Sequence, residues 1–348
     1  DVIVCHQTLW QGIEDRVSVA SGGWANLQFI RRIFRAYWLL LRRYRAVGDY
    51  DLMVVGYPGQ LDVFLARVLT WLRKKPLVLD IFMSLSLIAQ ERGLVKRHPF
   101  TGRMLHLLEN FAYRLPNRLI QDTPEYKAWL MSEFHLGDDR FRLVPTGADD
   151  RLFHPLEESP TSGATLHVLY YGSFIPNHGV PYIMEAAKAL VNAHDIMFTF
   201  IGEGPDKATA QSYALANQLQ NVEFIAWLPQ SELLSYISGA GICLGAFGNT
   251  PQSVMTVQNK IYECMAMRKP VVTGDSPAVR DHFQHNEQIY LVERANSLAL
   301  STAILNLSRD SKLRNHLAQG GYAVVEKYYT IQAIGKVYRE HLFMMLNA

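Results

Sequence analysis

The sequence has few cysteines and no long apolar run, and both shortages exclude classes of protein. Its 348 residues include three cysteines, Cys5, Cys243 and Cys264, and none of them stands in a C-x-x-C spacing. A disulfide framework and a zinc ribbon are therefore excluded, and a reducing cytoplasm is the expected compartment. The longest apolar stretches, such as residues 36–41, are far shorter than the roughly 18 residues that a membrane-spanning helix needs.

An excess of charge of one sign is also missing. The chain has 34 Lys and Arg against 32 Asp and Glu, so its composition does not favour a nucleic-acid-binding protein. The balance hides an asymmetry, because residues 1–150 hold 20 basic and 16 acidic residues, whereas residues 151–348 hold 14 and 16. With 49% hydrophobic residues, a chain of this length is expected to form two globular domains.

Short β-rich runs alternate with helical patterns along the chain, which is typical of βαβ units with parallel sheets. In the first half, strands are predicted at residues 52–56, 77–81, 118–121 and 141–144, with helices at 61–72, 103–113 and 124–134. In the second half, strands are predicted at residues 166–171, 197–201, 222–225, 242–244 and 270–273, with helices at 180–192, 208–218, 232–238 and 260–267. The turn-rich stretch 145–163 separates the halves. We therefore predict an α/β fold of two doubly wound, Rossmann-like domains, residues 1–150 and 151–330, which face a cleft beyond the carboxyl ends of their strands.

Residues 257–273 carry the most informative pattern. A helix that begins near Gln258 would place free backbone N–H groups and Lys260 in its first turn, where both stabilise a phosphate. Glu263, on a neighbouring face of the helix, could accept hydrogen bonds from a vicinal diol such as a ribose. An amphipathic helix with solvated Lys and Glu side chains fits the same residues and stays open as an alternative.

The stretch N-K-I-Y-E-C-M-A-M-R-K-P-V-V-T-G-D at residues 259–275 resembles the signature of the family-four retaining glycosyltransferases (glycosyltransferase group 1), which have the two-domain GT-B fold. Further segments resemble motifs of that family in the same order, at residues 145–153, 171–179, 201–205 and 224–229. The resemblance spans roughly residues 50–340. It implies that C-terminal helices cross back to the N-terminal domain, with residues 331–348 packing on it.

The resemblance also implies a site for a nucleotide-sugar donor. Glu263 would hold the ribose, and Lys260 would act in catalysis by stabilising the leaving diphosphate. The donor-binding candidates are Gly172, Ser173, His178, Gly202, Gly204, Trp227, Val257, Asn259, Lys260 and Glu263. No metal ion and no cofactor besides the donor is expected.

The sequence departs from the family pattern at three places. Met255 stands where the family has its first acidic residue, and Ser173 and His178 stand where it has Arg and Lys. These changes shift diphosphate binding toward Lys260 and backbone N–H groups. His178 is either a charged imidazole beside a phosphate or a turn histidine bonded to backbone. The family's glycine-rich loop has no clear match, since Gly22-Gly23 is a poor substitute, and we expect the first strand and its loop to precede Asp1.

Acceptor-side candidates lie in the first half. Asp80, at the carboxyl end of a predicted strand, is the candidate for orienting the acceptor hydroxyl or accepting its proton. Tyr57 and Ser84 could line the same pocket, although rim packing also explains Tyr57. Asp122-Thr123 before Pro124 fits the N-cap of a helix.

Two charged segments of the first half, residues 49–51 and 29–45, resemble known binding elements. The D-x-D sequence Asp49-Tyr50-Asp51 precedes a predicted strand instead of following one, so we interpret it as a solvated strand entrance and expect no metal. Residues 29–45 form a basic, aromatic-rich helical run. For the helix as a whole, an ordinary Rossmann helix with its arginines in water is the preferred interpretation. The alternative is peripheral contact with an anionic membrane, here the inner face of the plasma membrane.

The pattern as a whole favours a cytoplasmic, metal-independent retaining glycosyltransferase of the hexosyltransferase type. Its partners would be a nucleotide-sugar and a sugar or lipid-linked acceptor, and not a nucleic acid, in bacterial cell-surface polysaccharide, glycolipid or glycoconjugate synthesis. The alternatives are a sugar-nucleotide epimerase of the same fold and a non-catalytic paralogue that binds a nucleotide or a partner.

Overall fold

The computed structural model describes residues 1–8, 27–156 and 165–347. The chain separates into two units, Asp1–Asp51 and Leu52–Ala348. The Gly22-Gly23 pair and the turn residues 159–163 lie outside the described residues. Among the described residues, no helix combines the length and the apolar character that crossing a bilayer requires.

The first unit contains the helix α2 (Leu27–Arg45), which ends in Arg42, Arg43 and Arg45. Basic residues in a last turn are stabilised by the partial negative charge at that end of a helix. Residues 2–5, which have a strand-like sequence, form no strand in the described part of this unit. The D-x-D segment precedes the first strand of the second unit, as the sequence predicts.

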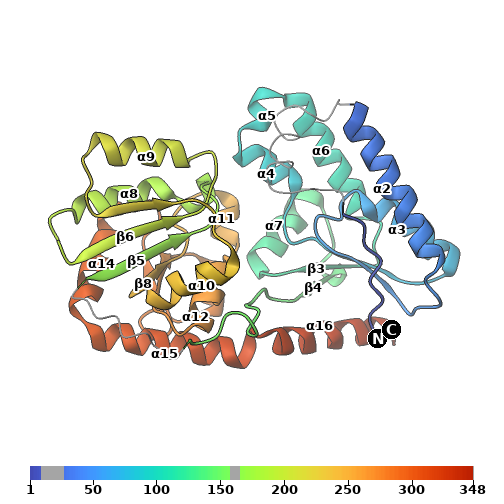
Figure 1. Cartoon of the computed structure of the whole chain (residues 1–348). Coiled ribbons are helices and arrows are strands. Elements are labelled where there is room, and N and C mark those ends of the chain that lie inside the picture. The colour runs from blue at the N-terminus through green and yellow to red at the C-terminus, as the bar shows by residue number, and fades with distance from the viewer. Residues whose placement is uncertain (9–26, 157–164, 348) are drawn as a thin grey trace. The chain divides into compact units, whose positions relative to one another are not determined.

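The second unit begins with a four-stranded parallel sheet of order β1-β2-β3-β4 (Figure 1). Its strands are β1 (Met53–Val55), β2 (Leu77–Asp80), β3 (Arg118–Gln121) and β4 (Phe141–Leu143). Its connections hold α3 (Asp62–Arg73), α4 (Leu85–Glu91), α5 (Leu94–Arg97), α6 (Pro99–Ala112), α7 (Pro124–Phe134) and the short η2 (Asp138–Arg140). Because side chains alternate along a strand, the sheet buries two faces. Leu77 and Leu79 pack beneath α3, α6 and α7, whereas Val78 packs toward the last helix, α16 (Ile331–Leu346).

A six-stranded parallel sheet of order β10-β9-β8-β5-β6-β7 follows. Its strands are β5 (Leu166–Tyr171), β6 (Ile196–Ile201), β7 (Val222–Ile225), β8 (Ile242–Leu244), β9 (Val271–Gly274) and β10 (Tyr290–Val292). Its helices are η3 (Pro176–His178), α8 (Val180–Ala189), α9 (Lys207–Ala216), α10 (Gln230–Gly239), α11 (Pro251–Met255), α12 (Asn259–Ala266), α13 (Pro277–His282), α14 (Ser297–Arg309) and α15 (Ser311–Tyr328). Alternate residues of β5 enter separate cores, with Tyr170 on the side of α8 and α14 and Tyr171 on the side of α12.

The predicted fold class is confirmed, including the C-terminal helix that crosses back to the first sheet. The predicted linker falls between β4 and β5, and the exact domain bounds stay a prediction. The sequence patterns missed α4, α5, α11 and β10, each of which is short. Periodicity identifies a helix only over several turns, so elements of four to seven residues carry too few apolar positions to be recognised.

At the carboxyl edge of the second sheet, the turn after β5 packs closely against the turn after β6. Gly172 follows β5 and Gly202 follows β6, and both have positive φ angles, 130° and 135°. A Cβ atom on Gly202 would overlap the carbonyl oxygen of Gly172. The Gly172 N–H donates to the carbonyl of Ile201 at the end of β6, and the Phe174 N–H donates to the Glu203 carbonyl, both at 2.9 Å, so the two turns are also hydrogen-bonded. Only glycine combines this backbone conformation with this contact.

We expect Gly202→Ala to lower the free energy of unfolding by about 2–4 kcal/mol, since both φ and the contact oppose a side chain. Gly239→Ala is the matched control, because a Cβ there meets nothing within 4 Å and Gly239 lies in α10. It should leave stability unchanged or raise it by about 0.5–1 kcal/mol. Denaturant unfolding followed by circular dichroism measures both. Equal stability of the two variants would contradict the packing described for the turns.

Candidate functional site

Lys260, the second residue of α12, is a buried ammonium beside aromatic rings. Only 6% of the residue is exposed, and its Nζ lies 4.3 Å from the centre of the Tyr170 ring and 6.0 Å from that of Tyr171. Burial lowers the pKa of Lys260 to about 7, an effect that the negative charge of Glu263 opposes in part. The contact with Tyr170 is a cation–π interaction, which stabilises the ammonium less than a paired carboxylate would.

His178 lies next to this ammonium and is neutral. Burial, and then the charge of Lys260, lower the pKa of His178 well below its usual value. Its Nδ1 lies 2.7 Å from the Ser173 carbonyl oxygen and 3.4 Å from Lys260 Nζ. We assign the proton to Nδ1, because a carbonyl oxygen at that distance must accept a hydrogen bond. Nδ1 therefore cannot accept from Lys260, and of the two alternatives for His178 the structure favours the turn histidine.

Glu263 is the second charged group of α12 at this edge of the sheet. The Tyr171 hydroxyl donates to its Oε2 at 2.6 Å, which fixes the orientation of the carboxylate. Burial raises the pKa of Glu263, and the Tyr171 hydrogen bond and Lys260 oppose this rise. Tyr170 and Tyr171 were not predicted as site residues. Two adjacent tyrosines at the end of a strand could have indicated that each face of the sheet carries a polar aromatic side chain there.

The remaining donor-binding candidates lie at the same carboxyl edge. A Cβ on Gly172 would meet Lys260 Nζ at 3.0 Å, and Gly204 has no room for a side chain against the Phe174 backbone. Val257 precedes α12 and is buried, and Asn259 is the exposed first residue of that helix. Gln258 is the N-cap of α12, and its side chain makes no hydrogen bond to the backbone of the first turn.

Two further positions complete the donor side. Trp227 follows β7 and is 54% exposed. Met255, at the place of the family's first acidic residue, ends α11, and its carbonyl oxygen accepts a hydrogen bond from Thr123 Oγ1 at 2.6 Å. The structure therefore brings Gly172, His178 and Lys260 into contact, with Glu263 one turn along α12.

On the acceptor side, Asp80 ends β2 on the face of the sheet that Val78 and α16 share. Burial raises the pKa of Asp80 to about 6, so the carboxylate is ionised at pH 7 and close to the range in which a general base is effective. Burial raises the pKa of Asp122 and of Tyr338 on α16, and the charge of Asp80 adds to the rise in both. Thr123 is the N-cap of α7 through a bond from the Tyr126 N–H, with Pro124 first in the helix, as predicted.

Tyr57 follows β1 and packs edge-on against Phe82, with ring centres 5.4 Å apart. It is 38% exposed. This packing agrees with the rim alternative.

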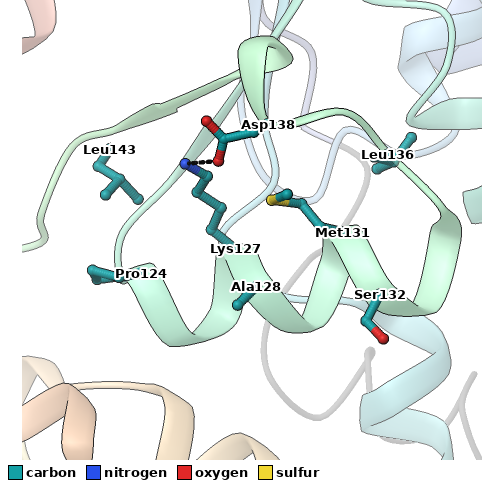
Figure 2. A pocket seen from close by; sticks show the side chains of 8 residues that line it. All are labelled: Pro124, Lys127, Ala128, Met131, Ser132, Leu136, Asp138 and Leu143. Atoms are coloured by element: carbon teal, nitrogen blue, oxygen red, sulfur yellow. Dashed lines mark ion pairs between the residues drawn. The ribbon is translucent and has the colours of Figure 1, made fainter.

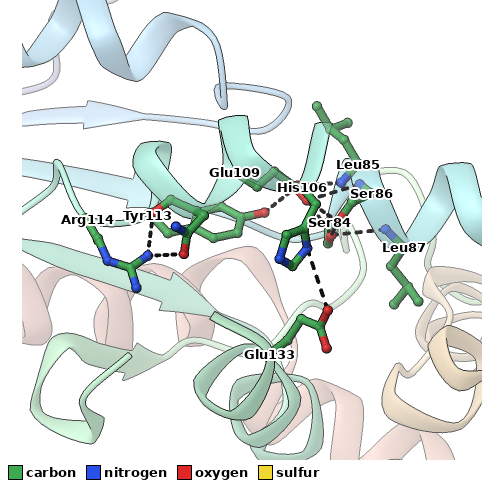
Figure 3. A network of polar contacts seen from close by, with 10 residues as sticks. Ser84, Leu85, Ser86, Leu87, His106, Glu109, Tyr113, Arg114 and Glu133 are labelled. Carbon is green, nitrogen blue, oxygen red and sulfur yellow. Dashed lines mark hydrogen bonds and ion pairs between the residues drawn. The ribbon is translucent and has the colours of Figure 1, made fainter. Parts of the chain in front are cut away.

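Ser84 differs from its predicted position on the acceptor side, because it is fully buried. Its hydroxyl donates to Glu109 Oε2 at 2.7 Å, and the same carboxylate accepts from the Leu85 and Ser86 N–H groups and from the Tyr113 hydroxyl (Figure 3). The carboxylate thus anchors the first turn of α4, and Ser84 is the N-cap of that helix. The hydroxyl of Ser84 is committed to this network and is not exposed to an acceptor.

Two cavities lie in the first half of the second unit, apart from the donor candidates. One, of about 550 Å³, lies along α7 and is bordered by the Lys127–Asp138 ion pair (Figure 2). The other, of about 400 Å³, lies between α4, α6 and α7, beside His106 and Trp129. Neither is lined by a residue that we predicted for donor binding.

Known proteins with similar sequences are glycosyltransferases. The chain is 26% identical to an alpha-D-kanosaminyltransferase of Streptomyces kanamyceticus over 214 residues, 59% of this chain and 53% of that protein. It is 25% identical to a phosphatidyl-myo-inositol mannosyltransferase of Mycobacterium leprae over 172 residues, 49% of this chain and 44% of that protein. The chain thus spans about half the length of these curated relatives.

Solved structures share the fold. Sucrose-phosphate synthase from Thermosynechococcus elongatus superposes with a TM-score of 0.71 at 18% identity, covering 91% of this chain and 79% of that one. The Anabaena protein HepE in complex with UDP superposes with a TM-score of 0.71 at 14% identity, covering 88% of this chain and 82% of that one. The two Rossmann-like halves therefore form a GT-B fold.

The family model described as glycosyl transferases group 1 matches residues 165–310, which contain β5 to β10 and every donor-binding candidate. The resemblance seen in the sequence is confirmed at this level. The six-stranded half of the chain therefore matches the model of the glycosyl transferases group 1 family.

Proposed function

We propose that the protein is a retaining glycosyltransferase that takes its sugar from a nucleotide-diphosphate donor. The observation that carries the proposal is the buried ammonium of Lys260, which faces Gly172 and has an aromatic ring in place of an anion as its close partner. A diphosphate placed there would pair with this charge and with the open N-terminus of α12. Both would stabilise the leaving group as charge develops on it.

The other candidates take roles around that diphosphate. Glu263, oriented by the Tyr171 hydroxyl, would accept hydrogen bonds from the ribose. Gly172 and Gly202 leave the backbone open to close approach by phosphate oxygens. Asp80 would orient the acceptor hydroxyl or accept its proton, with a pKa of about 6 suited to that task. Transfer would need no metal ion.

The relatives support an acceptor in glycoconjugate synthesis, since one of them carries a lipid in its name, phosphatidyl-myo-inositol mannosyltransferase. We propose a sugar or lipid-linked acceptor and a cytoplasmic location at the inner face of the plasma membrane. Contact through the basic helix is supported by α2, which exposes Phe34 and Trp38 and holds the Arg42 guanidinium 4.8 Å from the Trp38 ring. Met255 in place of an acidic residue favours a second candidate, a paralogue that binds the nucleotide without transferring sugar.

Two substitutions separate phosphate binding from ribose binding. Lys260→Met should weaken binding of UDP and of inorganic pyrophosphate alike, by about 10- to 100-fold, since a charge-assisted hydrogen bond contributes about 1.5–3 kcal/mol. Glu263→Gln should weaken UDP by about tenfold and leave pyrophosphate unchanged. Isothermal titration calorimetry gives both affinities, after a thermal-shift screen with UDP, GDP and ADP sugars identifies the base.

The matched control for this pair is Lys188→Met, which removes an exposed lysine of α8 and should bind as the wild type does. Wild-type protein that no nucleotide stabilises would overturn the proposed donor site. Nucleotide binding without any sugar transfer would instead favour the non-catalytic paralogue.

A pH dependence follows from the Lys260 pKa of about 7 in the free protein. A bound diphosphate favours the ammonium and raises this pKa, so UDP binding at pH 8 should take up close to one proton. Affinity should accordingly fall as pH rises above about 7. Binding heats measured in buffers of different ionisation enthalpy give the proton count. Lys260→Met should show no uptake at this pH, and an uptake that persists in that variant would assign the proton to another group.

A further inference from the structure

Arg294 follows β10 and is a second, partly buried cation at the carboxyl edge of the six-stranded sheet. Its Nε donates to the Asp275 carbonyl, and its Nη1 donates to the Gly248 carbonyl and to Ser253 Oγ, each at 2.8 Å. Nη2 is buried and has no hydrogen-bond partner among the described residues. Gly274, at the end of β9, leaves space for this side chain, because a Cβ there would lie 2.7 Å from Arg294 Cγ.

The groups that accept hydrogen bonds from Arg294 are uncharged, since they are backbone carbonyls and the Ser253 hydroxyl. Burial lowers the pKa of Arg294 to about 10, and the charge of Asp275 opposes this fall, so the guanidinium remains charged at pH 7. The Asp275 carboxylate is itself paired with Arg280, which donates to it through Nε at 2.6 Å and through Nη2. Like Lys260, Arg294 therefore carries a positive charge that is incompletely compensated in the free protein.

The segment that follows β8, residues 246–253, links this guanidinium to the turn after β5. The Ser253 hydroxyl, which accepts from the guanidinium, donates to the Asn177 carbonyl at 2.6 Å. The Phe247 N–H donates to the His178 carbonyl at 3.0 Å. Nδ1 of His178 lies 3.4 Å from the buried ammonium of the donor site. The guanidinium is therefore bonded to the segment that packs on the turn bordering this site.

The turn itself, residues 173–179, contains no Lys or Arg, and His178 is neutral. Lys260 thus supplies one positive charge, whereas a diphosphate carries more than one negative charge. We infer that Arg294 is a positioning residue of the donor site, which holds residues 246–253 against the turn and adds a second positive charge to the field that a diphosphate meets. The inference rests on the donor site of the proposed function and adds to it a cation that does not touch the donor.

The test is isothermal titration calorimetry of the full chain with inorganic pyrophosphate at pH 7. Arg294→Gln removes the charge but keeps an N–H donor, and it should weaken pyrophosphate binding about fivefold or more. Arg294→Lys keeps the charge but loses the planar fork of donors, so it should bind within about twofold of the wild type. Ser253→Ala removes a hydrogen-bond acceptor of Arg294 and the contact with Asn177 without changing any charge. It should also bind within about twofold of the wild type.

Arg309→Gln is the matched control, because it removes an exposed cation at the far end of α14, the helix that follows Arg294. This variant should bind pyrophosphate as the wild type does. Unchanged binding by Arg294→Gln would overturn the inference, and so would equal weakening by Arg294→Gln, Arg294→Lys and Ser253→Ala, which would assign the side chain a purely structural role. Both results leave the donor site in place, whereas wild-type protein that binds neither pyrophosphate nor a nucleoside diphosphate would overturn the donor site itself. Circular dichroism verifies that each variant is folded.

Discussion

The buried ammonium of Lys260 is the constraint on which the carboxyl edge of the second sheet depends. Removing this charge from water costs free energy that the Tyr170 ring, 4.3 Å away, offsets only in part. Gly172 has a positive φ, and a Cβ there would lie 3.0 Å from the ammonium. A Cβ on Gly202 would overlap the carbonyl oxygen of Gly172. Burial, and then the charge of Lys260, lower the pKa of His178 and leave it neutral. The edge is therefore organised around a positive charge that is incompletely compensated in the free protein, which is the electrostatic condition for binding an anion.

The buried charge beneath the first sheet, that of Glu109, is by contrast fully compensated. The Glu109 carboxylate accepts hydrogen bonds from two hydroxyls of α4's first turn, two backbone N–H groups and the Tyr113 hydroxyl. A carboxylate with this many donors is compensated where it lies, so it stabilises α4 and leaves no capacity for a ligand. Glu109 and Lys260 are both buried ions, but of the two only Lys260 lacks a strong partner. Glu109 therefore has a structural role, whereas Lys260 can bind a ligand. The bonding of Glu109 also explains why Ser84, at the carboxyl edge of the first sheet, belongs to the core.

The sequence predicted the elements and positions that depend on local patterns. Buried runs such as residues 77–79 and the Thr123 cap of α7 can be recognised from a few neighbouring residues. Lys260 and Glu263 were placed on the first turns of one helix from their spacing alone. The neutral state of His178 could not be predicted, because it results first from burial in the folded chain and then from the charge of a lysine 82 residues away. The burial of Ser84 likewise depends on a glutamate 25 residues along the chain. Contacts between distant segments decide which polar residues remain accessible, and one sequence does not contain them explicitly.

The position of α16 has a consequence for synthesis of the chain. Val78, Ile120 and Val144 form one side of the first sheet, and residues of α16 such as Ile334 and Tyr338 cover it. Between them on the chain lie all six strands of the second sheet. During translation, one apolar face of the first sheet therefore stays uncovered until α16 has been synthesised. That takes about 200 further residues, at about 5–20 residues per second. At these rates, the apolar side of the first sheet stays exposed to aggregation for about ten seconds or more.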